Sequence, residues 1–146
     1  MHADYVQSFM NDKVPVTNGM DIIVKKSDET GVELSASISA NINDKGVAFG
    51  GSLFSIASLA SWAVVDYILQ SQGIAAKIFV HTAQTKFLAP VTQDFSVTCL
   101  PPSAEEISGL FEMIAKKGRG RISVNAQIFE NGKLAFESTA DYVAVV

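Results

Sequence analysis

Two adjacent glycines, Gly50 and Gly51, lie at the start of a long apolar segment and are the clearest candidates for chemistry. If the segment is a helix, its first backbone N–H groups are unpaired and lie at the positive end of the helix dipole. Such groups can stabilise a carbonyl oxygen that gains negative charge, and glycine lets a substrate approach the backbone closely. The alternative is that the two glycines only permit a tight entry into the helix.

The same segment contains two candidate acid–base groups. Ser58 and Asp66 fall on one face of the expected helix, together with Trp62. A serine cannot act as a general base at neutral pH unless another group activates it. Asp66 lies about 12 Å beyond Ser58 at the rise of an α-helix. Because a buried aspartate needs a partner, Asp66 is either a catalytic group or the acceptor of a structural hydrogen bond.

Two polar residues outside the segment are further candidates. Asn43 lies in a polar loop ahead of the glycines, where asparagine is often a turn or cap residue. His81 alternates with Phe79 on a strand face that we expect to point toward the helix. There it is either a general base or polarising group, or a residue of the core. Ser58, His81 and Asp66 are the residue types of a hydrolytic triad, but nothing in the sequence fixes their geometry.

Residues 116–121 form the only concentrated basic patch in a chain whose formal net charge is -4. Lys117 and Arg119 in this patch are suited to bind phosphate groups or an acidic protein surface. The alternative is a helix C-terminus, which favours basic residues. The acidic balance argues against non-specific binding of nucleic acid. No histidine or cysteine cluster has metal-ligand spacing, so we expect no metal site.

The elements that position these residues can be read from hydrophobic periodicity. The segment 47–69 is long enough to span a bilayer, but its serines, its Asp66 and the absence of flanking basic anchors favour a buried core helix. Six stretches are typical of β-strands, and Ser103 and Glu106 form a capping box that begins a short helix before the fifth of them. The predicted strands are 20–26, 32–40, 77–89, 94–100, 122–128 and 133–145.

These elements predict an α+β fold in which a six-stranded antiparallel sheet wraps around one long central helix. Residues 3–12 add a short helix, and Asn131-Gly132 predicts the turn of the last hairpin. With 146 residues, 48% of them hydrophobic, the chain is expected to form one domain, residues 1–146, with a substantial core. One cysteine, Cys99, and an N-terminus without a signal pattern indicate a cytoplasmic protein.

Several short motifs in this order resemble the hotdog-fold thioesterase superfamily over residues 15–146. They are Asn43 ahead of Phe49-Gly50-Gly51, the sequence FLAPV at 87–91, Gly118-Arg119, and NGKLA at 131–135. The run GVAFGGSLF at 46–54 is more similar still to a family of thioesterase-like domains that also form the C-terminal part of acetyltransferase fusions such as YiiD.

The resemblance implies a fold, an activity and a set of site residues. Hotdog domains pair through edge strands into homodimers and often into homotetramers, with acyl-thioester sites at the subunit interface beside the N-terminus of the central helix. The implied substrates are acyl-CoA or acyl-carrier-protein thioesters of fatty acid metabolism, with no cofactor beyond the CoA of the substrate and no role for a membrane. Asn43 resembles the loop asparagine that orients water or a carbonyl group in some relatives. Together with the residues identified above, the candidate catalytic residues are Asn43, Gly51, Asp66 and Ser58, and the candidate substrate-binding residues are Phe49, Gly50, Trp62, His81, Lys117 and Arg119.

The sequence departs from its relatives at one position. Relatives with a His-Gly-Gly turn carry Asp or Glu about two helical turns further on, whereas here the turn begins with Phe49 and the corresponding residue is Ser58. The leading hypothesis is a thioester hydrolase in which Gly51 N–H holds the oxyanion. A non-catalytic acyl-thioester-binding or regulatory dimer, and a dehydratase or hydratase, remain as alternatives.

Overall fold

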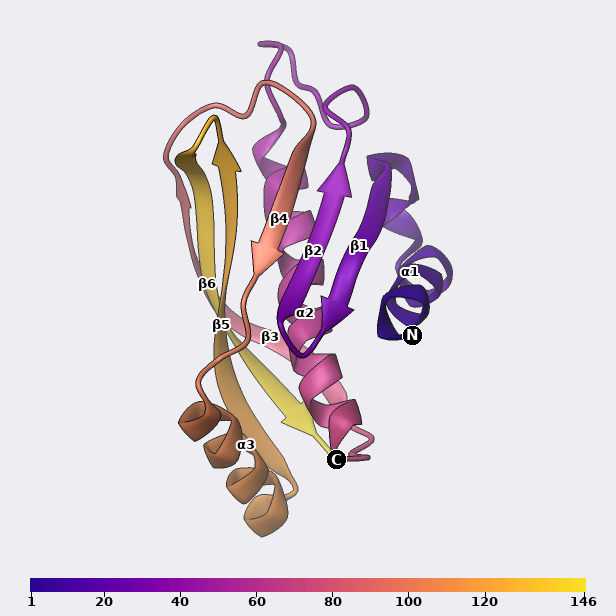
Figure 1. The fold of residues 1–146 in the computed structure, drawn as a ribbon, viewed down its shortest axis with the longest axis vertical. Coiled ribbons are helices and arrows are strands. Elements are labelled where there is room, and N and C mark those ends of the chain that lie inside the picture. The colour runs from indigo at the N-terminus through magenta and orange to yellow at the C-terminus, as the bar shows by residue number, and fades with distance from the viewer.

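The order of helices and strands in the computed structural model, which describes residues 1–146, is shown in Figure 1. The helices are α1 (His2–Lys13), the 3-10 helix η1 (Pro15–Met20), α2 (Gly50–Ser71) and α3 (Ala104–Lys117). The strands are β1 (Ile22–Asp28), β2 (Gly31–Ala36), β3 (Lys77–Phe87), β4 (Phe95–Cys99), β5 (Arg119–Glu130) and β6 (Lys133–Val145). The predicted elements are confirmed, although the strand expected at 32–40 ends earlier, at Ala36.

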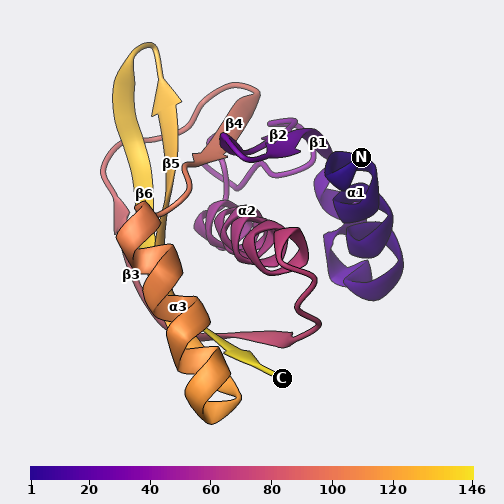
Figure 2. The same cartoon turned by 60° about the horizontal axis from the view of Figure 1, so that its bottom comes forward.

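The six strands form one antiparallel sheet in the order β1-β2-β4-β5-β6-β3. The sheet curves around α2, with α1 beyond the β1 edge and β3 at the opposite edge (Figure 2). Ile56, Ala60 and Val65 of α2 have no exposed surface, and 67% of the most apolar part of the helix is buried. By length and composition α2 could cross a membrane, but its burial is that of a core helix.

Local sequence signals determine several of the connections. Ser103 accepts a hydrogen bond from the N–H of Glu106, whose carboxylate accepts one from Ser103 N–H, and this capping box begins α3. Gly118 ends the helix in the left-handed conformation, with φ of 73°. Asn131 and Gly132 have φ of 53° and 79°, as a two-residue hairpin turn requires. Each connection was therefore predictable from a few adjacent residues.

A bulge in β3 overturns the predicted orientation of His81. The register of β3 against β6 shifts between Val80 and Thr82, so that Val80 pairs with the buried Tyr142. Side chains of paired residues lie on the same face, so Val80 points toward α2. His81 is instead exposed and lines the same hollow as Arg121. The alternation that placed Phe79 and His81 toward the helix was wrong because the bulge adds one residue to the strand.

The two edges of the sheet differ. Along β1, the side-chain amide of Gln7 donates to Ile22 O at 3.1 Å and accepts from Val24 N–H at 2.8 Å. Helix α1, with Val6 and Met10 buried, therefore covers this edge. Strand β3 hydrogen-bonds only to β6, and its other edge has no partner in the chain.

Candidate active site at the N-terminus of helix α2

The turn into α2 presents two free backbone donors. Phe49 is the N-cap residue, and its carbonyl oxygen accepts from the N–H groups of Ser52 and Leu53 at 3.0 and 3.1 Å. The N–H groups of Gly50 and Gly51 have no acceptor within the chain. They lie at the positive end of a 22-residue helix, which favours a bound oxygen that carries negative charge.

Two aromatic rings frame this turn. A Cβ atom on Gly51 would lie 2.5 Å from the Phe49 ring, and one on Gly50 would lie 3.2 Å from the Phe87 ring. Phe87 also packs edge-to-face against the buried Phe136, with ring centroids 5.3 Å apart. Packing against Phe87 therefore favours glycine at position 50, whereas the exposed Phe49 ring can move away from a Cβ atom at position 51. Phe87, which the sequence analysis did not single out, belongs to the site.

Asn43 stabilises the loop that leads to this turn. Its side-chain oxygen accepts from the N–H groups of Lys45 at 2.9 Å and Val47 at 3.2 Å. The neighbouring Asn41 is buried, donates from its side chain to Met20 O and Ser37 O at 2.8 Å, and accepts from Phe49 N–H at its backbone oxygen. The sequence analysis missed Asn41, for which the only signal was a second asparagine two residues before Asn43.

Ser58 lies half-buried on α2 and makes no side-chain hydrogen bond to His81 or Asp66. Its carbonyl oxygen accepts from the Tyr142 hydroxyl at 3.0 Å. Burial raises the pKa of Tyr142 to about 12, while hydrogen bonding with Ser61 and Ser58 opposes the rise. Ser58 is therefore a helix residue without an activating base, and no Ser-His-Asp triad forms around it.

Asp66 has a partner that sequence reasoning did not find. Its Oδ2 atom lies 2.9 Å from His2 Nε2 and 2.8 Å from Gln70 Nε2. The other ring nitrogen of His2, Nδ1, lies 2.6 Å from the hydroxyl of the buried Ser27. Since the carboxylate can only accept, Nε2 donates to Asp66. A terminal histidine gave no signal in the sequence, because residues 2, 27 and 66 meet only in the fold.

Asp66 also lines a hollow of about 400 Å³ at the C-terminal end of α2. Oδ1 of Asp66 makes no hydrogen bond within the chain, so one carboxylate oxygen remains available there. Gly51 lies fifteen residues earlier on the helix, which is about 22 Å at 1.5 Å per residue. Asp66 and Gly51 of one chain therefore cannot act on the same carbonyl group. The remaining residues of the hollow are Tyr5, Leu69, Gln70, Gly73, Ile74, Ala75 and Ala76.

Three of the candidate substrate-binding residues come together. His81, Lys117 and Arg119 line one hollow of about 590 Å³ with Arg121, and none of the four forms a salt bridge. Nearby, hydrogen bonding from the Ser123 hydroxyl is the main cause that lowers the pKa of Asp141, and the charges of Arg121 and His81 add to it. This basic hollow is suited to phosphate groups.

The basic hollow and the glycine turn lie at opposite ends of β3. Phe87, at the end of the strand, contacts the position of Gly50. Lys77, at its start, pairs with Val145, which in turn pairs with Arg119. Within one chain, a ligand at the glycine turn is thus a whole strand length away from the cations.

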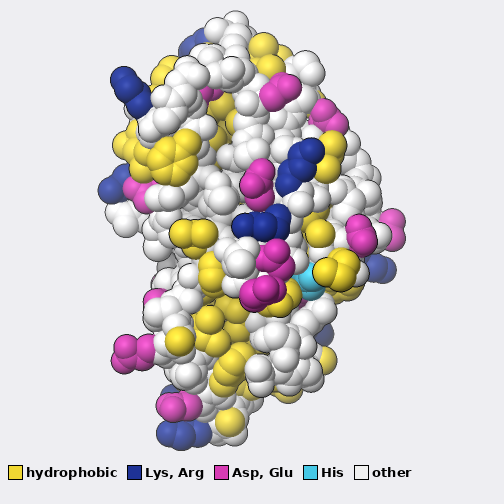
Figure 3. Space-filling model, in the orientation of Figure 1, with side chains coloured by type: hydrophobic (Ala, Val, Ile, Leu, Met, Phe, Trp, Pro, Cys, Tyr) yellow, Lys and Arg dark blue, Asp and Glu magenta, His cyan; other side chains and the backbone are white.

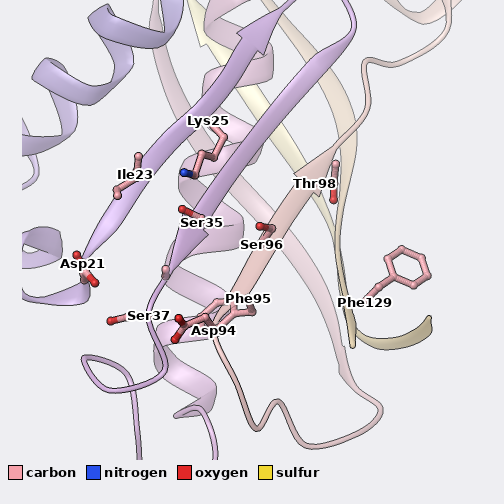
Figure 4. Close-up of a pocket in the computed structure, with 11 residues that line it drawn as sticks. Asp21, Ile23, Lys25, Ser35, Ser37, Asp94, Phe95, Ser96, Thr98 and Phe129 are labelled. Carbon is pink, nitrogen blue, oxygen red and sulfur yellow. The ribbon is translucent and has the colours of Figure 1, made fainter. Parts of the chain in front are cut away.

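Another hollow, of about 580 Å³, lies on the outer face of the sheet (Figure 4). Its side chains, among them Lys25, Ser35, Asp94 and Ser96, come from β1, β2 and the start of β4. They alternate with buried residues, so they point away from α2. Figure 3 shows the same face, where acidic and basic side chains are mixed over the strands. The hollow contains none of the predicted site residues, and its lining is mainly polar.

A six-stranded antiparallel sheet wrapped around one long helix defines the class of the chain as a hotdog fold. The family model described as "Putative thioesterase (yiiD_Cterm)" matches residues 3–146. The chain therefore belongs to this family, and the resemblance inferred from the sequence is confirmed.

Solved structures agree with this assignment. A protein of unknown function from Chlorobaculum tepidum is 29% identical with a TM-score of 0.94, over 98% of this chain and 93% of that chain. The putative thioesterase from Shewanella oneidensis is 24% identical with a TM-score of 0.85, over 99% and 98%. A probable thioesterase from Pseudomonas aeruginosa is 21% identical with a TM-score of 0.83, over 97% and 94%. No curated protein matched the sequence.

Proposed function

We propose that the protein hydrolyses acyl thioesters carried by coenzyme A or by an acyl carrier protein. The observation that carries this proposal is the pair of free N–H groups at Gly50 and Gly51, at the positive end of α2. A thioester carbonyl oxygen bound there gains negative charge as water attacks, and preorganised donors stabilise that charge. Membership of a thioesterase family supports the same class of reaction.

The proposal includes a homodimer that forms through β3, and pairs of dimers that form tetramers. The side chains of Phe79 and Val80 are 55% and 52% exposed, and the outer edge of β3 has unpaired backbone groups. An unpaired apolar edge strand is a template for pairing with another chain. A second copy, paired antiparallel about the middle of β3, would extend the sheet and cover these side chains.

Such pairing would complete the site. Antiparallel pairing brings the Lys77 end of one β3 beside the Phe87 end of the other, because the two strands run in opposite directions. Strand β3 and helix α2 both span about 33 Å, so the C-terminal half of the partner's α2 would lie level with the glycine turn. Asp66 of the partner subunit and Lys117 of the partner subunit would then approach Gly51.

In this arrangement each site residue has a defined role. Gly51 N–H binds the thioester oxygen, and the free carboxylate oxygen of Asp66 of the partner subunit removes a proton from the attacking water. The tetrahedral intermediate then collapses, the C–S bond breaks, and the thiolate takes the proton that Asp66 received. Asn43 and Ser58 help to orient the reactants, and Phe49, Gly50 and Trp62 contact the acyl group. His81, Lys117 and Arg119 bind the phosphates of CoA or acidic groups of a carrier protein.

The decisive test removes one backbone N–H donor and keeps the turn into α2. Gly51→Pro deletes one N–H group at a position in the first helical turn, where proline is tolerated. Gly51→Ala keeps the N–H group and adds only a Cβ atom, so it is the matched control. With an acyl-CoA panel we expect kcat to fall about 100-fold or more in the proline variant relative to the alanine variant. The proposal is contradicted if the wild-type oligomer hydrolyses neither acyl-CoA nor acyl-carrier-protein thioesters.

One observation favours a second candidate, a non-catalytic acyl-thioester-binding dimer. The helix position two turns beyond the glycines is Ser58, which has no activating base, and Asp66 is held by His2. Calorimetric titration with acyl-CoA, run beside the hydrolysis assay, distinguishes the two: binding without turnover supports the second candidate. The dehydratase or hydratase alternative loses its best residue, because the exposed His81 lies on the outer face of the sheet.

A further inference from the structure

Helix α1 presents a row of aromatic residues to α2. His2, Tyr5 and Phe9 lie on one face of α1, with centroid distances of 5.6 Å from His2 to Tyr5 and 6.0 Å from Tyr5 to Phe9. At one end the His2 ring meets Tyr67 edge-on at 5.2 Å. At the other end Phe9 stacks on Trp62, with centroids 4.6 Å apart and an interplanar angle of 15°. The row thus covers α2 from Tyr67 as far back as Trp62.

Several contacts hold α1 in this position. His2 is bonded to Asp66 and Ser27, its side chain is 8% exposed, and the Gln7 amide is bonded to the backbone of β1. Val6 and Met10 are each 2% exposed. The Phe9–Trp62 stack is therefore a fixed part of the fold.

The aromatic row of α1 does not extend over the face of α2 between the glycines and Trp62. Phe54, Ser55, Ser58 and Leu59 are all half-buried, and α1 makes no aromatic contact with this stretch. An acyl chain whose carbonyl group binds at Gly51 can lie along this stretch and meets the stacked rings at its end.

We propose that the Phe9–Trp62 stack is the end wall of the acyl site and makes the protein selective for medium-chain acyl groups. This inference rests on the proposed function. From Gly51 to Trp62 is eleven residues, or about 16 Å of helix. An extended hydrocarbon chain advances about 1.3 Å per carbon atom for a C–C bond of about 1.5 Å. After allowance for the thickness of the rings, about 10 to 12 carbon atoms fit.

The residues beyond the Phe9–Trp62 stack make the limit on acyl chain length sharper. The next residue on this face of α2 is Asp66, with the His2 ring bonded to it. A methylene group pushed past the stack would displace polar contacts of a half-buried carboxylate, which is unfavourable. Before the wall, each additional buried methylene group raises kcat/KM about fourfold. Beyond it, kcat/KM stops rising and then falls.

The test compares wild type, Phe9→Ala and Phe129→Ala on saturated acyl-CoA substrates of 4 to 18 carbon atoms. Phe9→Ala removes one ring of the wall, and we expect the ratio of kcat/KM for 16 carbons to that for 10 carbons to rise about tenfold or more. Phe129 is an exposed phenylalanine on β5 and is the matched control, for which the profile stays unchanged. An unchanged profile in a folded Phe9→Ala protein overturns the inference.

A second variant covers the case in which Phe9→Ala loosens α1. Ser58→Phe fills the stretch from within, and we expect its optimum to move two to four carbon atoms shorter; no movement counts against the wall. If wild type hydrolyses no thioester, the proposed function fails. The affinity of acyl-CoA as a function of chain length, measured by calorimetry, then decides the inference separately: a limit near 12 carbons that Phe9→Ala removes supports it, and its absence overturns it.

Discussion

The two edge strands of the sheet differ in whether their free backbone groups are covered within the chain. At β1, the Gln7 side chain bonds the free backbone groups of Ile22 and Val24, and α1 lies over the strand. At β3, the backbone edge is open and Val80 is 52% exposed. An open edge is a liability unless another strand pairs with it. The comparison shows that the chain completes one edge by itself and leaves the other open, where the proposed dimer would pair.

The two edges also lie near different groups of the proposed active site. The closed edge is joined to the C-terminal half of α2, through His2–Asp66 and Phe9–Trp62. The open edge leads to its N-terminus, where Phe87 contacts the glycine turn. Groups that lie about 22 Å apart along one helix belong to the two different edges, and only a second chain can bring them together.

The largest effect should come from separating the two halves of the site. Asp66→Asn removes the proposed general base, and we expect kcat to fall about 1,000-fold. Mixing this variant with Gly51→Pro under conditions of subunit exchange should restore about a quarter of the activity, since half the dimers are mixed and each has one intact site. Steady-state kinetics of the mixture measures this. If the mixture stays inactive while mixed dimers form, the shared site is refuted.

A charge placed on each edge tests the comparison directly. Val80→Asp would bury two like charges near the proposed two-fold axis, and we expect it to weaken the dimer by about 3 kcal/mol, or about 100-fold in Kd. Ile23→Asp is the matched control, because Ile23 is 50% exposed on the closed edge. Sedimentation velocity over a range of concentrations gives both values. Dissociation by the Ile23 variant alone would reverse the assignment of the edges.

Tyr142 is the cross-strand neighbour of Val80, behind the open edge, and it should make the stability of the fold depend on pH. Its folded-state pKa of about 12 lies above the unfolded value of about 10. The unfolded chain therefore loses the proton first, and stability is constant below pH 10 and falls as pH rises toward 12. The loss should reach about 2 kcal/mol by pH 12. Urea titrations of wild type and Tyr142→Phe at pH 8 to 11 measure it, and equal slopes in the two proteins would contradict the assignment.

The smallest effect concerns the closed edge. Gln7→Ala leaves Ile22 O and Val24 N–H without their side-chain partners, which should lower the free energy of unfolding by about 1 kcal/mol. It also opens a second strand edge, so we expect slow aggregation at high concentration. Denaturant titration and light scattering measure the two effects. Ser8→Ala, at an exposed position of the same helix, is the control, and an equal loss there would argue against a specific role for Gln7.

Features that depend on neighbouring residues were predictable from the sequence, and features that depend on distant ones were not. The capping box at Ser103 and the turn at Asn131-Gly132 are local, and both were confirmed. The period of α2 also predicted its burial. The bulge beside His81 has no local signal, because it is defined against β6. The His2–Asp66 contact joins residues 64 apart, so periodicity carried no information about it.

The buried thiol of Cys99 has a practical consequence for the acyl-CoA hydrolysis assays. The side chain has no exposed surface, and burial raises its pKa to about 12, so almost no thiolate exists at neutral pH. Because thiolate is the reactive form, the folded protein should remain unlabelled by aromatic disulfide reagents. Colour that develops in a mixture of enzyme, acyl-CoA and such a reagent then reports released coenzyme A alone. In denaturant, the reaction of the single cysteine with the same reagent measures the fraction of unfolded molecules.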